Sequence, residues 1–252
     1  MNSKKLEFPG SSGDMLSARI DYPDEDKSTA YVLFAHCFTC SKNLKAVGNI
    51  ARALTDRQMA VFRFDFTGLG ESEGDFADTN FSSNIDDLIA AATYMAQEYR
   101  APDILLGHSL GGAAVLQAAH QIENCKAVAT MGAPANPEHV KKNFGAKLDE
   151  IEEKGEAEVS LAGRSFTIKK QFLDDLDEAN MDRRIENLHR ALIIFHAPLD
   201  NTVGIENAGH IFKQAKHPKS FISLADADHL LSNPEDSRYA GNLLATWASK
   251  YL

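Results

Sequence analysis

The sequence of 252 residues has few cysteines and no long apolar run. Three cysteines cannot form a disulfide framework, and Cys37 and Cys40, although spaced C-x-x-C, have no second pair with which to hold a metal. Residues 1–7 lack the apolar stretch of a secretory signal, and no segment reaches the length that spans a bilayer. We therefore expect a cytoplasmic protein with no metal or other cofactor and no redox role.

Basic residues are also in short supply, because 26 Lys and Arg stand against 36 Asp and Glu, giving a net charge of −10. Nucleic acids and anionic membranes bind clustered positive charge, so the sequence argues against both as partners. Apolar residues make up 44% of the chain, which is enough for a sizeable core. This composition favours a single-domain enzyme over residues 1–252 that acts on a small molecule.

The most informative motif is Gly-His-Ser-Leu-Gly at residues 107–111, which follows the apolar run 104–106 and precedes the helix-like run 112–116. A glycine-flanked serine between a strand and a helix is typical of a nucleophile elbow. In such a turn Ser109 adopts a strained backbone conformation that exposes its hydroxyl, and a side chain at position 107 or 111 would collide with neighbouring backbone. The motif predicts that Ser109 is a catalytic nucleophile.

A serine nucleophile needs a histidine base and a carboxylate that orients the histidine. For this type of elbow, the chain order is Ser, then Asp or Glu, then His. Asp200 follows a predicted buried strand at 191–196, and His229 follows a shorter strand at 221–224. Since the ends of parallel strands meet at one edge of a sheet, we expect both side chains to lie near Ser109.

Each role has rival residues. Asp226 and Asp228 are alternative acids, but as sequence neighbours of His229 they would have difficulty reaching its Nδ1 atom. Of the nine histidines, the other eight lie at strand ends or on helix-like and polar segments, where structural roles are expected. Among them, His108 adjoins the nucleophile, and its side chain is expected to turn away from the Ser109 hydroxyl.

Alternating strands and helices predict an α/β fold with a mostly parallel sheet of eight strands, because helical crossovers join parallel strands. The predicted strands are 4–8, 15–22, 31–36, 60–65, 103–107, 126–131, 191–196 and 220–224, and the helices are about 43–57, 81–99, 109–120, 204–215 and 236–250.

This alternation breaks between about residues 134 and 188, where the segment is densely charged. Two strand-like runs flank a glycine-bearing turn, and helix-like runs lie on either side of them. The pattern predicts an inserted helix–hairpin–helix, with a helix at about 137–153, strands at 158–161 and 165–168 around a turn at 162–164, and a helix at 172–177.

The chain resembles the α/β-hydrolase fold superfamily over nearly its whole length. The matching segments are 34–38, 65–72, the elbow at Ser109, 198–200 with Val203, and 228–230. Within the superfamily it is similar to small serine esterases, including cinnamoyl and feruloyl esterases, and to the hydrolase half of proteins fused to an OsmC-like domain.

This resemblance implies an oxyanion hole built from the backbone amides of Leu110 and Phe38, with Cys37 in place of the glycine that usually precedes the second donor. It also implies that the insertion at about 134–188 is a lid over the active site. The apolar residues of the insertion must bury somewhere, and we expect some to surround the substrate. The predicted substrate-binding residues are Phe38, His108, Phe144, Phe166, Phe172 and Leu176.

Together these observations predict a carboxylesterase-type serine hydrolase. It would cleave short to medium carboxylic esters through an acyl-enzyme, and hydroxycinnamoyl esters are included on the resemblance alone. A thioesterase or small-peptide hydrolase with the same catalytic residues is the alternative, and a non-catalytic binding module is a more remote one. The protein partners we consider are a second copy of the chain in a homodimer and, on the resemblance, a fused or separate OsmC-like domain.

Overall fold

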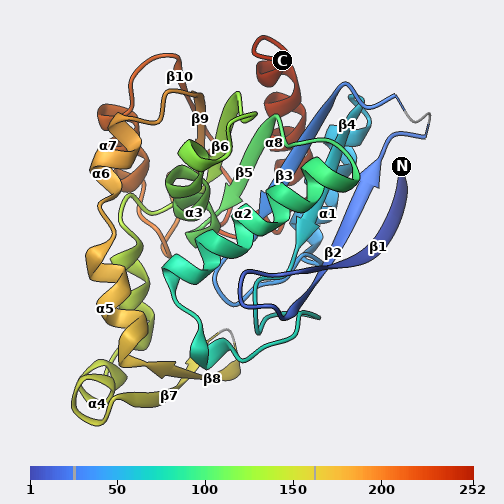
Figure 1. Ribbon diagram of the computed structural model, residues 1–252. Helices are drawn as coiled ribbons and strands as arrows, with labels where there is room; N and C mark the ends of the chain where they lie inside the picture. Colours follow the sequence, from blue (N-terminus) through green and yellow to red (C-terminus); the bar gives the residue numbers. More distant parts are fainter. Residues whose placement is uncertain (25–26, 162) are drawn as a thin grey trace.

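A central sheet dominates the computed structural model, which describes residues 1–24, 27–161 and 163–252. Within these ranges eight strands pair in the order β1-β2-β4-β3-β5-β6-β9-β10 (Figure 1). β2 pairs antiparallel with β1 and β4, and the other pairs are parallel, which confirms the predicted fold class. The strands are β1 (Asn2–Pro9), β2 (Met15–Tyr22), β3 (Ala30–Ala35), β4 (Met59–Phe64), β5 (Ile104–His108), β6 (Ala127–Met131), β9 (Ala191–His196) and β10 (Lys219–Ser223).

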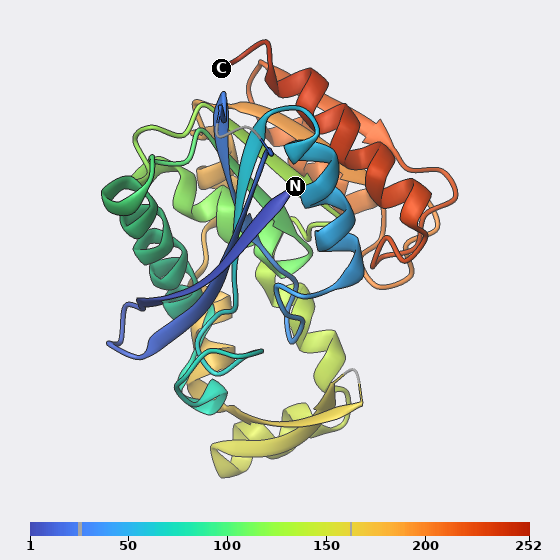
Figure 2. The same ribbon diagram turned by 90° about the vertical axis from the view of Figure 1, so that its right-hand side faces the viewer.

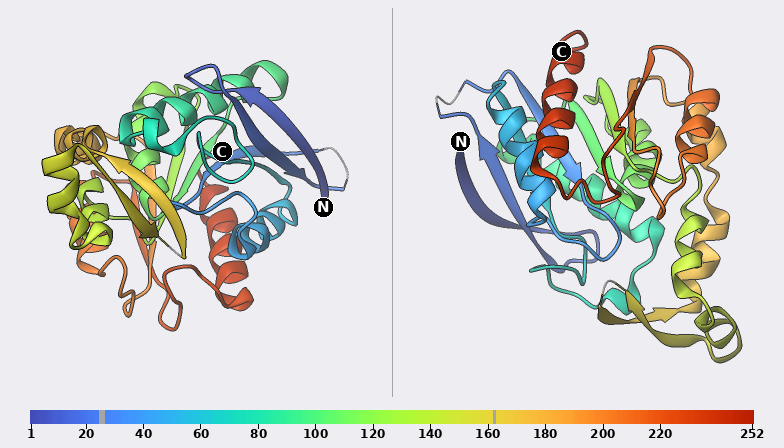
Figure 3. Two further views of the ribbon diagram at one scale, coloured as in Figure 1. Left: turned by 90° about the horizontal axis from the view of Figure 1, so that it is seen from below. Right: turned by 180° about the vertical axis from the view of Figure 1, so that it is seen from behind.

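Helices cover both faces of this sheet (Figure 2). Side chains on successive strand residues point to opposite faces, so in β3 Leu33 packs into one core cluster while Val32 and Phe34 pack into the other. The Leu33 cluster includes side chains from α2 (Phe81–Glu98), α3 (Leu110–Ala118) and α7 (Glu206–Gln214). The opposite cluster includes side chains from α1 (Lys45–Thr55) and α8 (Pro234–Ala248), which lie side by side in Figure 3.

Burial on both faces explains why the central strands are continuous apolar runs rather than alternating ones. Every residue of β4, β5, β6 and β9 is buried. None of the helices in the described ranges combines the length and the apolar character that crossing a bilayer requires.

The segment between β6 and β9 forms a separate structure with its own two-stranded sheet, below the main sheet in Figure 1. The predicted hairpin is present, and the predicted second helix is longer than expected. The predicted first helix is instead divided at Gly145, whose φ of +51° ends one helix before the next begins. A further short helix, α6, was not predicted. The elements are η3 (Pro137–Phe144), α4 (Lys147–Lys154), β7 (Glu156–Leu161), β8 (Arg164–Lys169), α5 (Lys170–Glu178) and α6 (Met181–Glu186). Ala162, part of the predicted turn, lies outside the described residues.

The strand directions determine where polar loops gather. β3, β5, β6, β9 and β10 run in parallel, so the segments that follow them emerge at the same edge of the sheet. The predicted nucleophile follows β5, the predicted acid follows β9 and the predicted base follows β10. The topology therefore brings the three predicted residues to one edge.

Candidate active site

Ser109 occupies the sharp turn between β5 and α3. Its backbone has φ 53° and ψ −125°, a conformation that non-glycine residues rarely adopt. Hydrogen bonds hold the turn on both sides: the Ser109 amide donates to the Met131 carbonyl at 2.8 Å, and the Gly112 amide donates to the Ser109 carbonyl at 2.8 Å. The strand–turn–helix geometry predicted for a nucleophile elbow is present, with the serine in the strained position.

The two flanking glycines are required by close backbone contacts. A Cβ atom at Gly107 would lie 2.2 Å from the carbonyl oxygen of Gly111. A Cβ atom at Gly111 would lie 2.4 Å from the carbonyl oxygens of Ala35 and His36, where the chain leaves β3. Both distances are far below van der Waals contact, so the collision predicted for a side chain at either position has a defined partner.

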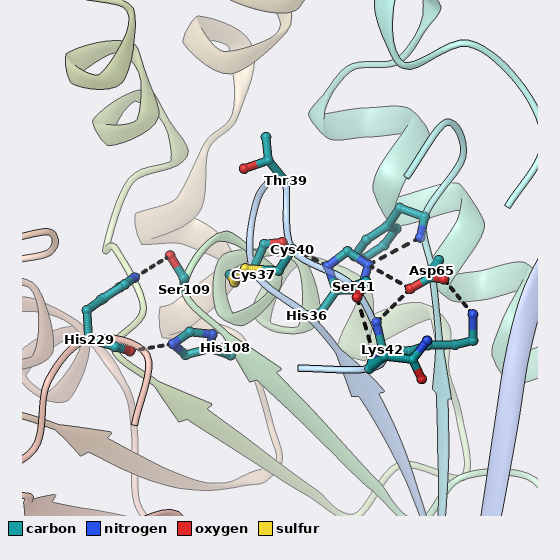
Figure 4. The surroundings of a disulfide bond; sticks show 12 residues. His36, Cys37, Thr39, Cys40, Ser41, Lys42, Asp65, His108, Ser109 and His229 are labelled. Carbon is teal, nitrogen blue, oxygen red and sulfur yellow. Dashed lines mark hydrogen bonds and ion pairs between the residues drawn. A yellow bond between two sulfur atoms is a disulfide. The ribbon is translucent and has the colours of Figure 1, made fainter. Parts of the chain in front are cut away.

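Ser109, His229 and Asp200 form a continuous hydrogen-bonded chain. The Ser109 Oγ and His229 Nε2 atoms are 3.0 Å apart (Figure 4), and His229 Nδ1 lies 2.7 Å from Asp200 Oδ2. The other carboxylate oxygen of Asp200 accepts hydrogen bonds from the amides of Thr202 and Val203, each at 2.9 Å. Asp200 is thus fixed by its own loop and presents one oxygen to the histidine.

The surroundings of Asp200 keep it ionised. Burial of its side chain acts to raise its pKa, but the hydrogen bonds from His229 and from the two backbone amides outweigh burial and lower the pKa below its usual value. The rival carboxylate Asp228 is exposed and caps its own loop, where it accepts a hydrogen bond from the Ser232 amide at 2.8 Å. The geometry therefore favours Asp200 over Asp228 as the partner of His229.

His108 supports the histidine loop from below. Its side chain is buried, and its Nε2 atom lies 2.7 Å from the His229 carbonyl oxygen (Figure 4). Burial lowers the pKa of His108 to about 4, so a neutral ring donates this hydrogen bond at neutral pH. His108 does not line the cavity at Ser109, which corrects the prediction that it contacts the substrate. Its ring is directed at the His229 carbonyl oxygen instead.

A cavity of about 430 Å³ opens at Ser109 and His229. Phe38 and Leu110, the predicted oxyanion residues, line the same cavity. Leu110 is the first residue of α3, so its amide has no acceptor within the helix and points toward the helix N-terminus. The other lining residues are Cys37, Thr39, Cys40, Pro134, His139, Val140, Asn143, Ser160, Leu161, Thr202, Val203 and Leu230.

The four apolar residues of the insertion that were predicted to contact substrate do not line this cavity. Phe144, Phe172 and Leu176 are buried in the main core, and Phe166 packs against it while partly exposed. The reason is aromatic packing: the Phe38 ring contacts the rings of Phe144 and Phe172 at centroid distances of 6.3 Å and 5.6 Å. Phe144 and Phe172 pack against the Phe38 ring instead of lining the cavity.

The insertion reaches the cavity through residues that sequence reasoning missed. His139 and Asn143 come from η3, and Ser160 and Leu161 come from the end of β7. His139, expected to have a structural role, also places its Nε2 atom 2.6 Å from the Thr202 carbonyl oxygen across the cavity rim. The strand-like run 158–161 before a glycine-bearing turn predicted this strand, but nothing in the sequence indicated that its end lines the cavity at Ser109.

Cys37 and Cys40 form a disulfide at the cavity wall (Figure 4). From the sequence we expected no disulfide framework and no metal or redox role for this pair, so the disulfide corrects that expectation. The third cysteine, Cys125, is free and buried. In the described ranges, no cluster of three or more His, Cys, Asp or Glu side chains is arranged to hold a metal ion.

Comparison with known proteins agrees with this fold. The profile of a family described as serine aminopeptidase, S33, matches residues 26–151, which is half of the chain. The chain belongs to this family. Like the fold, the S33 match supports an α/β hydrolase, and the elbow serine falls inside the matched region.

Similarity to solved structures covers nearly the whole chain. The esterase domain of a Rhodothermus marinus protein is 49% identical, with a TM-score of 0.83, over 100% of this chain and 99% of that one. Est1E from Butyrivibrio proteoclasticus, solved with bound ferulic acid, is 20% identical with a TM-score of 0.85, over 97% and 99% of the two chains, and shows a shared fold. The uncharacterized protein YfhR of Salmonella typhi is 25% identical over 189 residues, which are 75% of this chain and 61% of that protein.

Proposed function

We propose that the protein hydrolyses short to medium carboxylic esters through an acyl-enzyme intermediate. The observation that carries the proposal is the hydrogen-bonded chain from the Ser109 hydroxyl through His229 to Asp200, at 3.0 Å and 2.7 Å. A strained elbow holds the hydroxyl, and a buried carboxylate holds the imidazole. This arrangement meets the geometric requirements for nucleophilic catalysis by serine.

In the first half-reaction the Ser109 oxygen attacks the ester carbonyl carbon while His229 Nε2 takes the hydroxyl proton. Asp200 stabilises the imidazolium and keeps its Nδ1–H directed at the carboxylate. The C–O bond to the alcohol then breaks, and His229 donates its proton to the leaving alkoxide. Water repeats the sequence on the acyl-enzyme, with His229 again as the base, and releases the acid.

We infer that the amides of Leu110 and Phe38 stabilise the negative charge of each tetrahedral intermediate. The position of both residues on the cavity wall beside Ser109 supports this inference. Removing one donor of an oxyanion hole costs about 10²- to 10³-fold in kcat. We also propose that the segment between β6 and β9 acts as a lid, since η3 and β7 supply part of the cavity wall.

The cavity favours an ester over the peptide with a free amino terminus that the family description suggests. An aminopeptidase must bind an ammonium group, and a carboxylate is the usual partner for it. Among the described residues that line the cavity there is no Asp or Glu, and the apolar ones include Val140, Leu161 and Val203. The volume of about 430 Å³ suits a small acyl or aryl ester, including the hydroxycinnamoyl class.

Two measurements test the proposal. A fluorophosphonate should label wild-type protein once and should not label Ser109→Ala. Equal labelling of both proteins would refute the assignment of Ser109 as the nucleophile. A panel of 4-nitrophenyl esters, acyl thioesters and aminoacyl anilides should show the largest kcat/KM for the esters. Preferential cleavage of anilides or of thioesters would instead identify the peptidase or the thioesterase alternative.

A further inference from the structure

The chain that leaves β3 is a tight loop whose backbone encloses the proposed oxyanion donor. The Cys40 amide donates to the Cys37 carbonyl oxygen at 3.0 Å, and the disulfide joins the same two residues. Phe38 and Thr39 stand between the two cysteines in the chain, so the backbone of both residues belongs to the ring that these two bonds close. Its amide can therefore change direction only if this ring opens or deforms.

One residue of the loop is held in an unfavourable conformation. Thr39 has a φ of +62°, a left-handed value that a β-branched residue rarely adopts because it strains the backbone. Its carbonyl oxygen accepts a hydrogen bond from Arg164 at the start of β8, and its side chain is buried. The loop needs constraints to keep this conformation, and the disulfide is the covalent one.

The far end of the loop has an independent anchor. Lys42 is buried, its amide donates to Asp65 at 2.6 Å, and its ammonium group lies 2.5 Å from the same carboxylate. Opening the disulfide would leave this anchor intact. The loss of constraint would then be confined to residues 37–40, next to Ser109, while the core stays packed.

From this geometry we propose that the Cys37–Cys40 disulfide positions the Phe38 amide and makes ester hydrolysis dependent on thiol–disulfide exchange at the cavity wall. The inference rests on the proposed esterase function. Both sulfur-bearing residues line the cavity, and Cys40 is half-buried while Cys37 is buried. Cys40 is therefore the accessible half of the bond.

The exchange partner is a dithiol. A thiolate entering the cavity attacks Sγ of Cys40; a bond forms between these sulfurs, the Cys37–Cys40 bond breaks, and its electron pair leaves on Cys37 Sγ. The second thiol of the reductant then attacks the mixed disulfide and releases Cys40. Two electrons and two protons pass to the cysteines, and the dithiol is oxidised to its disulfide. An oxidised dithiol reverses the sequence.

The reduced enzyme should have a lower kcat and a nearly unchanged KM. Freed from the ring, Thr39 can relax to a negative φ and turn the neighbouring peptide groups, so the Phe38 amide no longer aims at the oxyanion. The Phe38 ring remains held by Phe144 and Phe172, so the donor is misaligned but not lost. We expect kcat to fall about 10- to 100-fold, less than the 10²- to 10³-fold cost of removing a donor.

The experiment measures kcat and KM for a 4-nitrophenyl ester on oxidised protein, on protein reduced with dithiothreitol, and after reoxidation with oxidised dithiothreitol. Thiol counting on unfolded samples should give one thiol, then three, then one again. Cys125→Ser is the matched control and should keep the full redox response, because Cys125 is buried away from the cavity. Cys40→Ser should have the kcat of reduced wild type, and dithiothreitol should not change that kcat. Its far-ultraviolet circular dichroism spectrum should be the same as that of wild type.

A second variant separates positioning from a general effect on stability. Asn tolerates a positive φ better than Thr does, so Thr39→Asn should need the disulfide less. Its ratio of oxidised to reduced kcat should be smaller than the ratio of wild type. Equal kcat in oxidised and reduced wild type would overturn the proposal while leaving the esterase function standing. If neither form cleaves esters or reacts with a fluorophosphonate at Ser109, the proposed function itself has failed.

Discussion

Replacing Asp200 with Asn is the most informative single change at the proposed active site. One oxygen of Asp200 accepts two backbone hydrogen bonds at 2.9 Å, and the other faces His229 Nδ1 at 2.7 Å. In Asp200→Asn the amide oxygen must keep facing the two backbone donors, since an NH₂ group cannot accept their hydrogens. The NH₂ group is then directed at the histidine.

This orientation inverts the histidine tautomer. His229 Nδ1 becomes the acceptor, the ring hydrogen moves to Nε2, and Nε2 can no longer take the proton of Ser109. The same tautomer change lowers kcat about 10⁴-fold in a serine protease, equivalent to about 5.4 kcal/mol of transition-state stabilisation. We expect a loss of this order in the hydrolysis of a 4-nitrophenyl ester, with the loop and the fold retained.

Asp228→Asn is the matched control, because Asp228 adjoins the histidine in sequence but bonds to Ser232. It should keep kcat within about threefold of wild type. If Asp200→Asn retained a tenth or more of wild-type kcat, the structural reasoning for Asp200 would be refuted. A large loss in Asp228→Asn alone would transfer the role to that residue.

Three further changes test the framework around the site. Gly111→Ala should lower both the melting temperature and kcat, because the new methyl group would lie 2.4 Å from two backbone oxygens; unchanged values would refute the required close approach. Lys42→Met should lower the free energy of unfolding in urea by about 3–5 kcal/mol, since it leaves the buried Asp65 carboxylate without its ammonium partner, whereas Lys5→Met at an exposed ion pair should cost less than about 1 kcal/mol. Between pH 6.5 and about 4, His108 binds a proton in the unfolded chain but not in the folded chain. The free energy of unfolding should therefore fall as the pH drops through this range. His108→Gln should reduce the slope of the free energy of unfolding against pH. A slope unaffected by the substitution would contradict the burial of a neutral ring.

The sequence was sufficient to predict the sheet and the three side chains that meet at its edge. The elbow motif determines its own geometry, because Gly107 and Gly111 leave room for crossing backbone and Ser109 sits in the strained position between them. Asp200 and His229 could be selected because each follows a parallel strand, and parallel strands end at one edge. Local pattern and topology determine these features, and both can be derived from residue order.

The cavity wall could not be derived in this way. His139, Asn143 and Ser160 reach the site only through the way the insertion packs across the sheet edge, which is a long-range property. The aromatic residues of the insertion were expected around the substrate, but Phe144 and Phe172 pack against each other and against Phe38 instead. The apolar character of a side chain predicts that it will be buried, but only the tertiary packing determines which residues it contacts.

The disulfide was missed for a related reason. A C-x-x-C spacing is compatible with a metal site, with two free thiols or with a bond, and the backbone of the intervening residues decides among them. Here the turn at Phe38 and Thr39 brings the Cα atoms of Cys37 and Cys40 to 5.3 Å, within the range in which a disulfide forms. The positive φ of Thr39 that makes this approach possible has no sequence signal, since Thr rarely adopts it.

The central claim is that acyl transfer passes through the Ser109 oxygen. Mixing enzyme with a 4-nitrophenyl ester, quenching in acid within the first turnovers and analysing the peptides by mass spectrometry tests this directly. The account predicts that the peptide containing Ser109 gains the mass of the acyl group, and that Ser109→Ala gains none. Sustained ester turnover with no acyl adduct, or an adduct on another side chain, would contradict it.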